Sequence, residues 1–473
     1  MLDTLALDVI EDPWRQAYHL CPPQGLLNDP NGLIFWRGAY HVFYQWNPHG
    51  CRHENKHWAH ARSTDLIHWE LLPPALAPDA PYDEDGCYSG CAVEVDGDLF
   101  LLYSGNVRSP DGGRASYQCL AHSRDGVGFD KLGPVINGVL PGYTGHFRDP
   151  KAWRQGDHWY AVLGAQRTDL TGTVLLLKSP DLRQWQSLGE LIAPALPCYM
   201  YECPDLFTLD RRTVLVCCQQ TMETGAGGTR RSDVAGYMLG QIDLERAQFP
   251  HSGFRPLDQG FDFYAPQTLL GPDGRRLLIG WMGLPVQPQT PTVASGWMHC
   301  LTLPRELTLE GDQLMQRPAR ELAMLRSATI RVPDVDLEAN TAFVLPQPDG
   351  GAWELDLSIR AECPAGWVLH LFDSAQQSLS LAFDGVGTLT LRRHCPMAGQ
   401  INERKTCGIG GPVTRLQVFI DRSSVEMFVN DGVAVLTTCC YPAAEPEAPR
   451  LQARQPLSLR DIHVWPLEDR LAR

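Results

Sequence analysis

A unit of about 59 residues recurs five times in the first two thirds of this 473-residue chain. Each copy consists of a turn residue followed by a short apolar strand, and the copies begin at residues 38, 97, 156, 212 and 274. A fixed period of this size, built from strands and turns, is typical of a β-propeller. Five copies therefore predict five blades. A long sandwich would also contain periodic apolar strands, but it gives no reason for a constant spacing.

The pattern changes after about Thr308. Residues 317–325 carry apolar side chains at helical spacing and predict a short connector. Beyond it, apolar and polar residues alternate in 353–359 and in 424–437, where Asn430-Asp431-Gly432 is a strong hairpin turn signal. We expect an all-β fold with a five-bladed propeller in 1–316, a connector in 317–336 and an antiparallel β-sandwich in 337–473. A helical second domain is the alternative, and the two-residue period argues against it.

A polar, turn-rich segment lies 7 to 12 residues before each repeat start. If each segment begins the innermost strand of a blade, all five face the axial channel at one end. One segment alone is most simply a solvated loop, but five at matching register predict a functional cluster. The segments are Asn28-Asp29-Pro30-Asn31, Tyr88-Ser89-Gly90, Arg148-Asp149-Pro150, Glu202-Cys203-Pro204-Asp205 and Asp262-Phe263-Tyr264-Ala265-Pro266-Gln267.

Three acids of this cluster suggest its chemistry. Two carboxyls on either side of a glycosidic bond are the usual equipment for glycoside hydrolysis, one ionised and one protonated. Asp29 lies between Asn28 and Asn31, whose amides can stabilise its anion, whereas apolar neighbours should raise the pKa of Glu202 and make it the acid. Arg148 should keep Asp149 charged, for binding hydroxyls or opposing positive charge. An Asx turn at Asp29 and a structural ion pair between Arg148 and Asp149 are the simpler alternatives.

Composition excludes several classes of partner. The net charge of -15 without a basic cluster argues against nucleic acid and an anionic membrane surface. No run of 18 apolar residues exists, and the acidic start Met1–Asp8 lacks a basic n-region, so we expect neither a membrane span nor a secretory signal. The 15 cysteines include adjacent pairs at 217–218 and 439–440, which suit a reducing cytoplasm. No zinc-type spacing is present, so we expect no metal and no cofactor.

Motifs along nearly the whole chain resemble those of glycoside hydrolase family 32, the invertases, fructanases and sucrose-6-phosphate hydrolases. They are residues 28–32, Tyr44-Gln45, Trp58-Ala59-His60-Ala61, 88–90, 148–150, 202–204, 263–267 and Asp421-Arg422-Ser423-Ser424-Val425-Glu426. The resemblance implies a propeller plus sandwich and a retaining mechanism without metal. It implies that Asp29 is the nucleophile, Glu202 the acid/base and Asp149 the transition-state stabiliser. It implies substrate contacts at Leu26, Asn28, Gln45, Trp58, Tyr88, Ser89, Arg148 and Tyr264.

Two departures from the family pattern bear on the substrate. Leu26-Leu27 stands where the family usually has Trp-Met, and Arg52, His53 and Lys56 stand where it often has Trp-Gly-Pro-Met. That loop, together with Tyr143-Thr144-Gly145-His146, looks like the bacterial sucrose-6-phosphate hydrolases. We therefore expect a small sugar as the partner, with Arg52, His53 or Lys56 contacting a phosphate on its glucosyl half.

Several alternatives stay open from sequence. The loop at 52–56 could be only an exposed polar loop. A cytoplasmic invertase or fructan hydrolase on unphosphorylated sugars, fructosyl transfer, and a non-catalytic sugar-binding propeller are the competing functions. The chain could act as a monomer or a homodimer.

Overall fold

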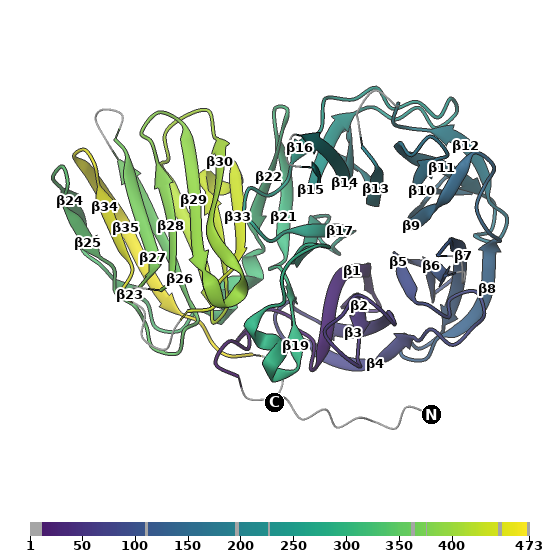
Figure 1. Ribbon diagram of the computed structural model, residues 1–473, viewed down its shortest axis with the longest axis horizontal. Coiled ribbons are helices and arrows are strands. Elements are labelled where there is room, and N and C mark those ends of the chain that lie inside the picture. The colour runs from purple at the N-terminus through teal and green to yellow at the C-terminus, as the bar shows by residue number, and fades with distance from the viewer. Residues whose placement is uncertain are drawn as a thin grey trace.

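The computed structural model describes residues 12–108, 112–193, 198–225, 228–360, 365–374, 376–442 and 447–470. Within these residues, five antiparallel sheets surround a common axis at one side of the molecule, and two larger sheets pack together at the other (Figure 1). This arrangement confirms the predicted all-β class, with a five-bladed propeller followed by a sandwich.

The blades follow the chain in order, each from its inner strand outward. Blade 1 also takes β19 (Trp297–Met298) as a parallel neighbour of β1, and blade 5 takes β20 (Cys300–Leu301) beside β18. The strands are β1 (Gly25–Trp36), β2 (Ala39–Asn47), β3 (His57–Ser63) and β4 (Glu70–Leu76) in blade 1; β5 (Cys87–Val95), β6 (Asp98–Arg108), β7 (Arg114–Ser123) and β8 (Asp130–Ile136) in blade 2; β9 (Tyr143–Gln155), β10 (His158–Arg167), β11 (Gly172–Ser179) and β12 (Gln186–Glu190) in blade 3; β13 (Met200–Leu209), β14 (Arg212–Gly225), β15 (Gly228–Gly240) and β16 (Arg255–Pro256) in blade 4; and β17 (Tyr264–Leu270), β18 (Arg276–Met282), β21 (Arg305–Glu310) and β22 (Gln313–Pro318) in blade 5.

The predicted repeat starts coincide with the turns into the second strand of each blade. Gly38, Gly97, Gly156 and Gly274 occupy these turns with φ between 61° and 86°. Glycine adopts this left-handed conformation without a steric penalty, which explains why it marks four of the five copies. Blade 4 uses Asp210 and Arg211 at positive φ instead.

Apolar side chains fill the spaces between adjacent blades. Trp58 of blade 1 and Tyr103 of blade 2, for example, are both fully buried and meet edge to face with ring centroids 6.2 Å apart. The inner strands β1, β5, β9, β13 and β17 contact one another in sequence around the ring. The interblade cores therefore hold the five inner strands in a fixed register about the axis.

The sandwich has one sheet in the order β23-β35-β26-β31-β32-β33, with β24 beside β35, and a second in the order β25-β34-β27-β28-β29-β30. The alternating segments predicted at 353–359 and 424–437 form β26 and the β32–β33 hairpin. The strands are β23 (Ile330–Arg331), β24 (Val335–Leu337), β25 (Ala342–Val344), β26 (Trp353–Arg360), β27 (Trp367–Asp373), β28 (Ser378–Phe383), β29 (Thr388–Cys395), β30 (Gln400–Gly408), β31 (Arg415–Asp421), β32 (Ser424–Val429), β33 (Ala434–Cys439), β34 (Arg450–Ala453) and β35 (Leu457–Pro466).

Helical structure in the described residues is confined to short 3-10 turns. They are η1 (Pro291–Ser295), η2 (Arg320–Leu325), η3 (Pro396–Ala398) and η4 (Asn430–Gly432). The connector predicted at 317–325 contains η2, between the end of β22 at Pro318 and the start of β23 at Ile330. No helix in the described ranges has the length and apolar character needed to cross a bilayer.

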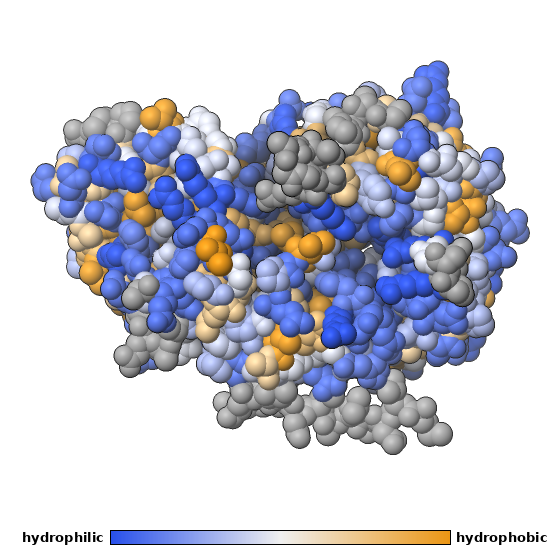
Figure 2. All heavy atoms as spheres, viewed as in Figure 1, coloured by the Kyte–Doolittle hydropathy of each residue, from blue (hydrophilic) through white to orange (hydrophobic). Residues whose placement is uncertain are grey.

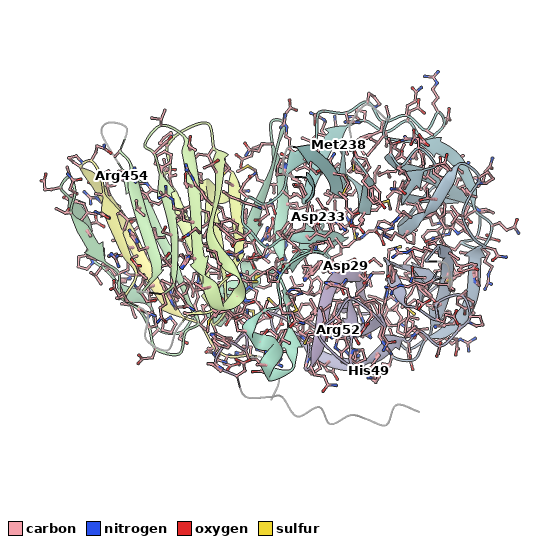
Figure 3. All side chains as sticks on the ribbon, in the orientation of Figure 1. Asp29, His49, Arg52, Asp233, Met238 and Arg454 are labelled. Carbon is pink, nitrogen blue, oxygen red and sulfur yellow. The ribbon has the colours of Figure 1, made fainter. Side chains whose placement is uncertain are left out.

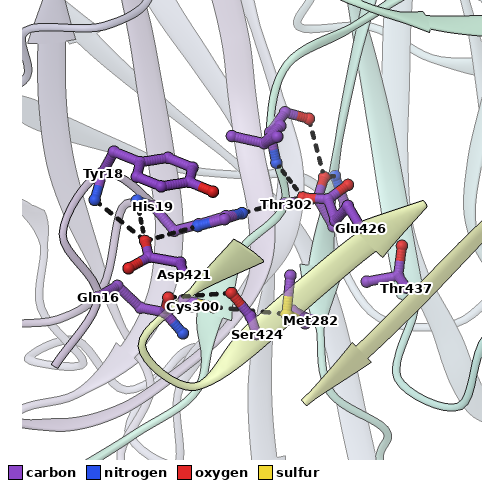
Figure 4. Close-up of polar contacts among 12 residues, drawn as sticks. Gln16, Tyr18, His19, Met282, Cys300, Thr302, Asp421, Ser424, Glu426 and Thr437 are labelled. Carbon is purple, nitrogen blue, oxygen red and sulfur yellow. Dashed lines mark hydrogen bonds and ion pairs between the residues drawn. The ribbon is translucent and has the colours of Figure 1, made fainter. Parts of the chain in front are cut away.

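Buried ion pairs join the sandwich to the propeller (Figure 4). His19 lies between Asp421 of β31 and Glu426 of β32, with Nδ1 2.9 Å and Nε2 3.0 Å from their carboxylate oxygens. Arg305 of β21 donates to the same Glu426 over 2.6 Å, and all four side chains are fully buried. Because losing one partner would leave a buried charge unpaired, this network couples the docking of the two parts to their folding.

Candidate active site

A cleft of about 320 Å³ opens at one end of the inner strands. Figure 2 shows its mouth near the centre of the propeller, with hydrophilic residues around it. Among the predicted site residues, the cleft is lined by Asn28, Asp29, Gln45, His53, Lys56, Tyr88, Arg148, Asp149, Glu202 and Tyr264. Folding therefore brings together all three predicted acids and most of the predicted substrate contacts.

Every inner strand has an irregularity at its site residue. The register with the second strand shifts after Leu27 in β1, Tyr88 in β5, Arg148 in β9, Glu202 in β13 and Tyr264 in β17. Proline follows within two or three residues in four of these strands, and because proline has no N–H it suits a point where the ladder is broken. A bulge turns side chains away from the regular alternation, so the five shifts aim polar groups into the cleft.

Asp29 is held by neutral hydrogen-bond donors. Its Oδ1 accepts from Asn28 Nδ2 at 3.0 Å, and its Oδ2 accepts from Ser89 Oγ at 2.5 Å. Burial raises the pKa of Asp29, and the bonds from Ser89 and Asn28 oppose that rise. Ser89, rather than the predicted Asn31, is thus the second group that stabilises this anion.

A chain of hydrogen bonds orients the groups around Asp29. Gln45 donates to Ser89 Oγ at 2.5 Å and accepts from Asn28 at 2.8 Å. Lys56, which is buried, donates its Nζ proton to Asn28 Oδ1. These polar side chains leave the carboxylate of Asp29 few alternative orientations.

Glu202 is held by a cation and two further donors. Its Oε1 accepts from Arg148 Nη2 at 2.7 Å, and its Oε2 accepts from Tyr264 Oη at 2.8 Å and from Gln220. Burial alone would raise the pKa of Glu202, but Arg148 and Tyr264 hold it below its usual value. The prediction of a raised pKa at this residue is therefore wrong for the free site.

Asp149, like Asp29, has a raised pKa. Its backbone adopts φ of 67°, and its Oδ2 accepts from the backbone N–H of Cys203 at 3.0 Å. Burial raises the pKa of Asp149 to about 7, and the nearby charges of Glu202 and Asp29 add to the effect of burial. The adjacent Arg148 was predicted to keep Asp149 ionised, but its guanidinium Nε lies 3.9 Å away because Arg148 points at Glu202.

Four of the predicted contacts lie outside the lining of the cleft, and one of them, Ser89, is buried and reaches the site through its hydrogen bond to Asp29. Leu26 and Trp58 are at most 1% exposed and belong to the core, where the indole Nε1 of Trp58 donates to the backbone oxygen of Tyr88 at 3.1 Å. Arg52 is exposed, and Figure 3 places it farther from the centre of the ring than Asp29. Leu26 and Trp58 therefore pack beneath the residues of the cleft, and Arg52 is exposed to solvent outside it.

Several residues that line the cleft were not among the predicted site residues. His146 lies between Arg148 Nη1 at 3.0 Å and Tyr199 Oη at 3.1 Å. Gln220 of β14 and Trp281 of β18 are on second strands, where Trp281 pairs directly with Tyr264. Hairpin register was the signal that could have found Trp281, because a residue opposite a bulged site residue reaches the same end of the blade. The others missed are Arg108, Arg114, Arg231 and Pro285.

Comparison with known proteins gives a consistent result. The model described as the glycosyl hydrolases family 32 N-terminal domain matches residues 19–318, and the family 32 C-terminal model matches 321–466. A sucrose-6-phosphate hydrolase of Klebsiella pneumoniae is 44% identical over 441 residues, 92% of this chain and 90% of that protein. The corresponding protein of Bacillus subtilis is 41% identical over 440 residues, 91% of this chain and 90% of that protein.

Solved structures agree with these matches. A family 32 β-fructofuranosidase of Bombyx mori in complex with sucrose has a TM-score of 0.84 and 31% identity, with 99% of this chain and 97% of that chain covered. The sucrose-6-phosphate hydrolase of Lactobacillus gasseri also has a TM-score of 0.84 and 31% identity, with 98% and 95% covered.

Proposed function

Since this chain belongs to glycosyl hydrolase family 32 and is a β-fructofuranosidase that hydrolyses sucrose 6-phosphate or sucrose, we propose that Asp29, Glu202 and Asp149 carry out this hydrolysis with retention. The observation that carries the assignment is the shared cleft. Asp29 and Glu202 line it together, and the charge of Glu202 contributes to the raised pKa of Asp29. Retaining glycosidases act through two carboxyls in one site, one as nucleophile and one as acid/base.

In the first step, ionised Asp29 attacks the anomeric carbon of the fructosyl unit and forms an ester. The bond to the glucosyl oxygen breaks, and Glu202 gives its proton to that oxygen. The hydrogen bonds from Ser89 and Asn28 support this role, since they favour the anion that must attack.

Glu202 can carry a proton only when its bond to Arg148 weakens. We propose that the sugar hydroxyls compete for Arg148, and that the negative charge of Asp29 then favours protonated Glu202. Once the ester forms, that negative charge disappears, so the pKa of Glu202 falls. Glu202 can then act as a base that activates the water which hydrolyses the ester.

Asp149 is proposed to stabilise the oxocarbenium-like transition state. Its pKa of about 7 in the free site means that it gains negative character most easily when positive charge develops beside it. The bond from the backbone of Cys203 fixes its orientation. The remaining proposed contacts, Gln45, Tyr88 and Tyr264, lie in the same cleft.

Phosphorylated sucrose is the proposed preferred substrate, with the unphosphorylated sugar as the second candidate. The relatives named sucrose-6-phosphate hydrolase support this preference, and so does the cationic character of the cleft. Its side chains include five lysines or arginines against three carboxylates in a chain whose net charge is -15. Monomer and homodimer both stay predictions.

Release of reducing sugar from sucrose and from sucrose 6-phosphate tests the assignment. Asp29→Asn and Glu202→Gln should each lower kcat/KM on the order of a thousandfold or more. The first substitution removes the proposed nucleophile, and the second removes the proposed proton donor. Asp157→Asn, an exposed turn residue between β9 and β10, is the matched control and should retain activity. Mass spectrometry of the rapidly quenched enzyme should find the fructosyl ester on the peptide that contains Asp29. Undiminished activity in either variant would refute the assignment.

A further inference from the structure

Five cationic side chains line the cleft, and they differ in what they bind. Arg148 pairs with Glu202 at 2.7 Å, Arg231 pairs with Asp233 at 2.7 Å, and Lys56 donates to Asn28. Within the described part of the chain, the guanidinium groups of Arg108 and Arg114 have no carboxylate within ion-pair distance. Among the described residues, these two are therefore the cations of the cleft without a carboxylate partner.

The two arginines face each other across one strand pair. Arg108, the last residue of β6, is the direct cross-strand partner of Arg114, the first residue of β7. Like charges placed directly opposite each other destabilise a sheet. Burial lowers the pKa of Arg114, and the positive charges of Arg148 and Arg108 add to that effect. An anion bound between the two guanidinium groups would relieve this repulsion.

Arg114 is also held in place beside the reacting groups. Its Cζ lies 5.4 Å from the ring centroid of Tyr88, a cation–π contact. Tyr88 is followed by Ser89, whose hydroxyl donates to Asp29. Arg114 is half-buried at the side of the cleft. Its guanidinium contacts Tyr88, the residue before the Ser89 that donates to Asp29.

We propose that Arg108 and Arg114 form the subsite for the phosphate of the sugar substrate, an inference that rests on the proposed function. The glucosyl half is the leaving group that Glu202 protonates, and Glu202 lines the same cleft as Arg108 and Arg114. A phosphate on that half carries oxygens that two guanidinium groups can bind with paired hydrogen bonds. The loop at 52–56 suits this role less well, because Arg52 is exposed outside the cleft and Lys56 is bonded to Asn28.

The ratio of kcat/KM for sucrose 6-phosphate to that for sucrose measures the subsite directly. Arg108→Gln and Arg114→Gln should each lower this ratio about tenfold, and the double variant should lower it by about a hundredfold, because each arginine makes charge-assisted bonds to the phosphate alone. Arg124→Gln is the matched control. Arg124 follows the opposite end of β7 and its side chain is 85% exposed, so the ratio should not change.

A binding measurement gives a second readout that does not need turnover. Calorimetric titration should show that the parent protein and Arg124→Gln bind glucose 6-phosphate more tightly than glucose, and that the double variant loses this difference. An unchanged ratio and an unchanged binding difference in the double variant would overturn the proposal. A fall in the ratio for Arg52→Gln alone would also overturn it. Preferential binding of glucose 6-phosphate without hydrolysis of either sugar would instead refute the proposed function and support the subsite.

Discussion

Replacing Lys56 by methionine should move the acidic limb of the pH profile of kcat/KM to higher pH. Lys56 is 3% exposed, and its Nζ donates to Asn28 Oδ1 while the amide nitrogen of Asn28 donates to Asp29 at 3.0 Å. Burial lowers the pKa of Lys56 to about 7, so the side chain is charged throughout the acidic limb. That positive charge lowers the pKa of Asp29.

The size of the shift follows from the separation of the two charges. One amide group lies between them, so roughly 6 Å and an effective dielectric constant of about 20 give an interaction of about 2 to 3 kcal/mol. Since about 1.4 kcal/mol corresponds to one pKa unit, the upper limit is about two units, and solvent in the cleft should reduce it to about one. The reaction needs ionised Asp29, and loss of the cation favours its protonated form, so the limb moves upward.

The assay is the pH dependence of kcat/KM on sucrose for the parent, Lys56→Met and Lys56→Arg. The arginine variant keeps the positive charge and should keep the position of the limb. An acidic limb that stays in place or moves to lower pH in Lys56→Met would refute the electrostatic argument. If the methionine variant changed only the preference for sucrose 6-phosphate, Lys56 would be a phosphate contact, as its sequence position suggests.

Two further predictions concern single residues. Burial opposes the charged form of His19, but Asp421 and Glu426 raise its pKa to about 9, so this histidine stabilises the fold fully below about pH 6.5 and loses its contribution as pH rises through 9. Urea unfolding should show a loss of about 3 kcal/mol between these limits in the parent, and a His19→Gln variant that is less stable throughout should lack this loss. Tyr264→Phe removes a bond that favours ionised Glu202, so the pKa of Glu202 should rise. The alkaline limb of kcat, which needs protonated Glu202, should then move to higher pH; an unchanged limb would argue against Glu202 as the acid.

The ring of blades could be predicted because its signals are local. A turn glycine with positive φ begins each of four second strands, and a polar segment lies 7 to 12 residues before each repeat start. Because the unit of about 59 residues repeats, residues far apart in sequence occupy corresponding positions in successive blades. This is why Asp29, Asp149 and Glu202 could be placed in one cleft without coordinates. The hydrogen-bond or ion-pair partner of each side chain, by contrast, could not be predicted from local sequence. Arg148 adjoins Asp149 in sequence but points at Glu202, because β9 changes register between Arg148 and Lys151.

The alternation of apolar and polar residues along a strand also fails to predict which side chains face the cleft where both faces of the sheet are covered. The inner and second strands are covered on each face by neighbouring blades, so an aromatic residue such as Trp58 can belong to a site motif and still be wholly buried. The motif that contains Trp58 indicates that this blade contributes to the site, and only packing decides which of its side chains reach the cleft.

The same distinction separates the cations of the cleft. In the sequence, Lys56 and Arg52 lie beside a recognisable motif, whereas Arg108 and Arg114 belong to none of the motifs that predicted the site. By structure, Lys56 is used internally to orient Asn28, and the two strand-end arginines are left facing each other. A charge that already has a partner must give it up to bind a ligand, which costs free energy, whereas two like charges that face each other are stabilised when an anion enters. The preference for a phosphorylated sugar should therefore depend on β6 and β7 of blade 2 rather than on the loop that carries the family-specific sequence.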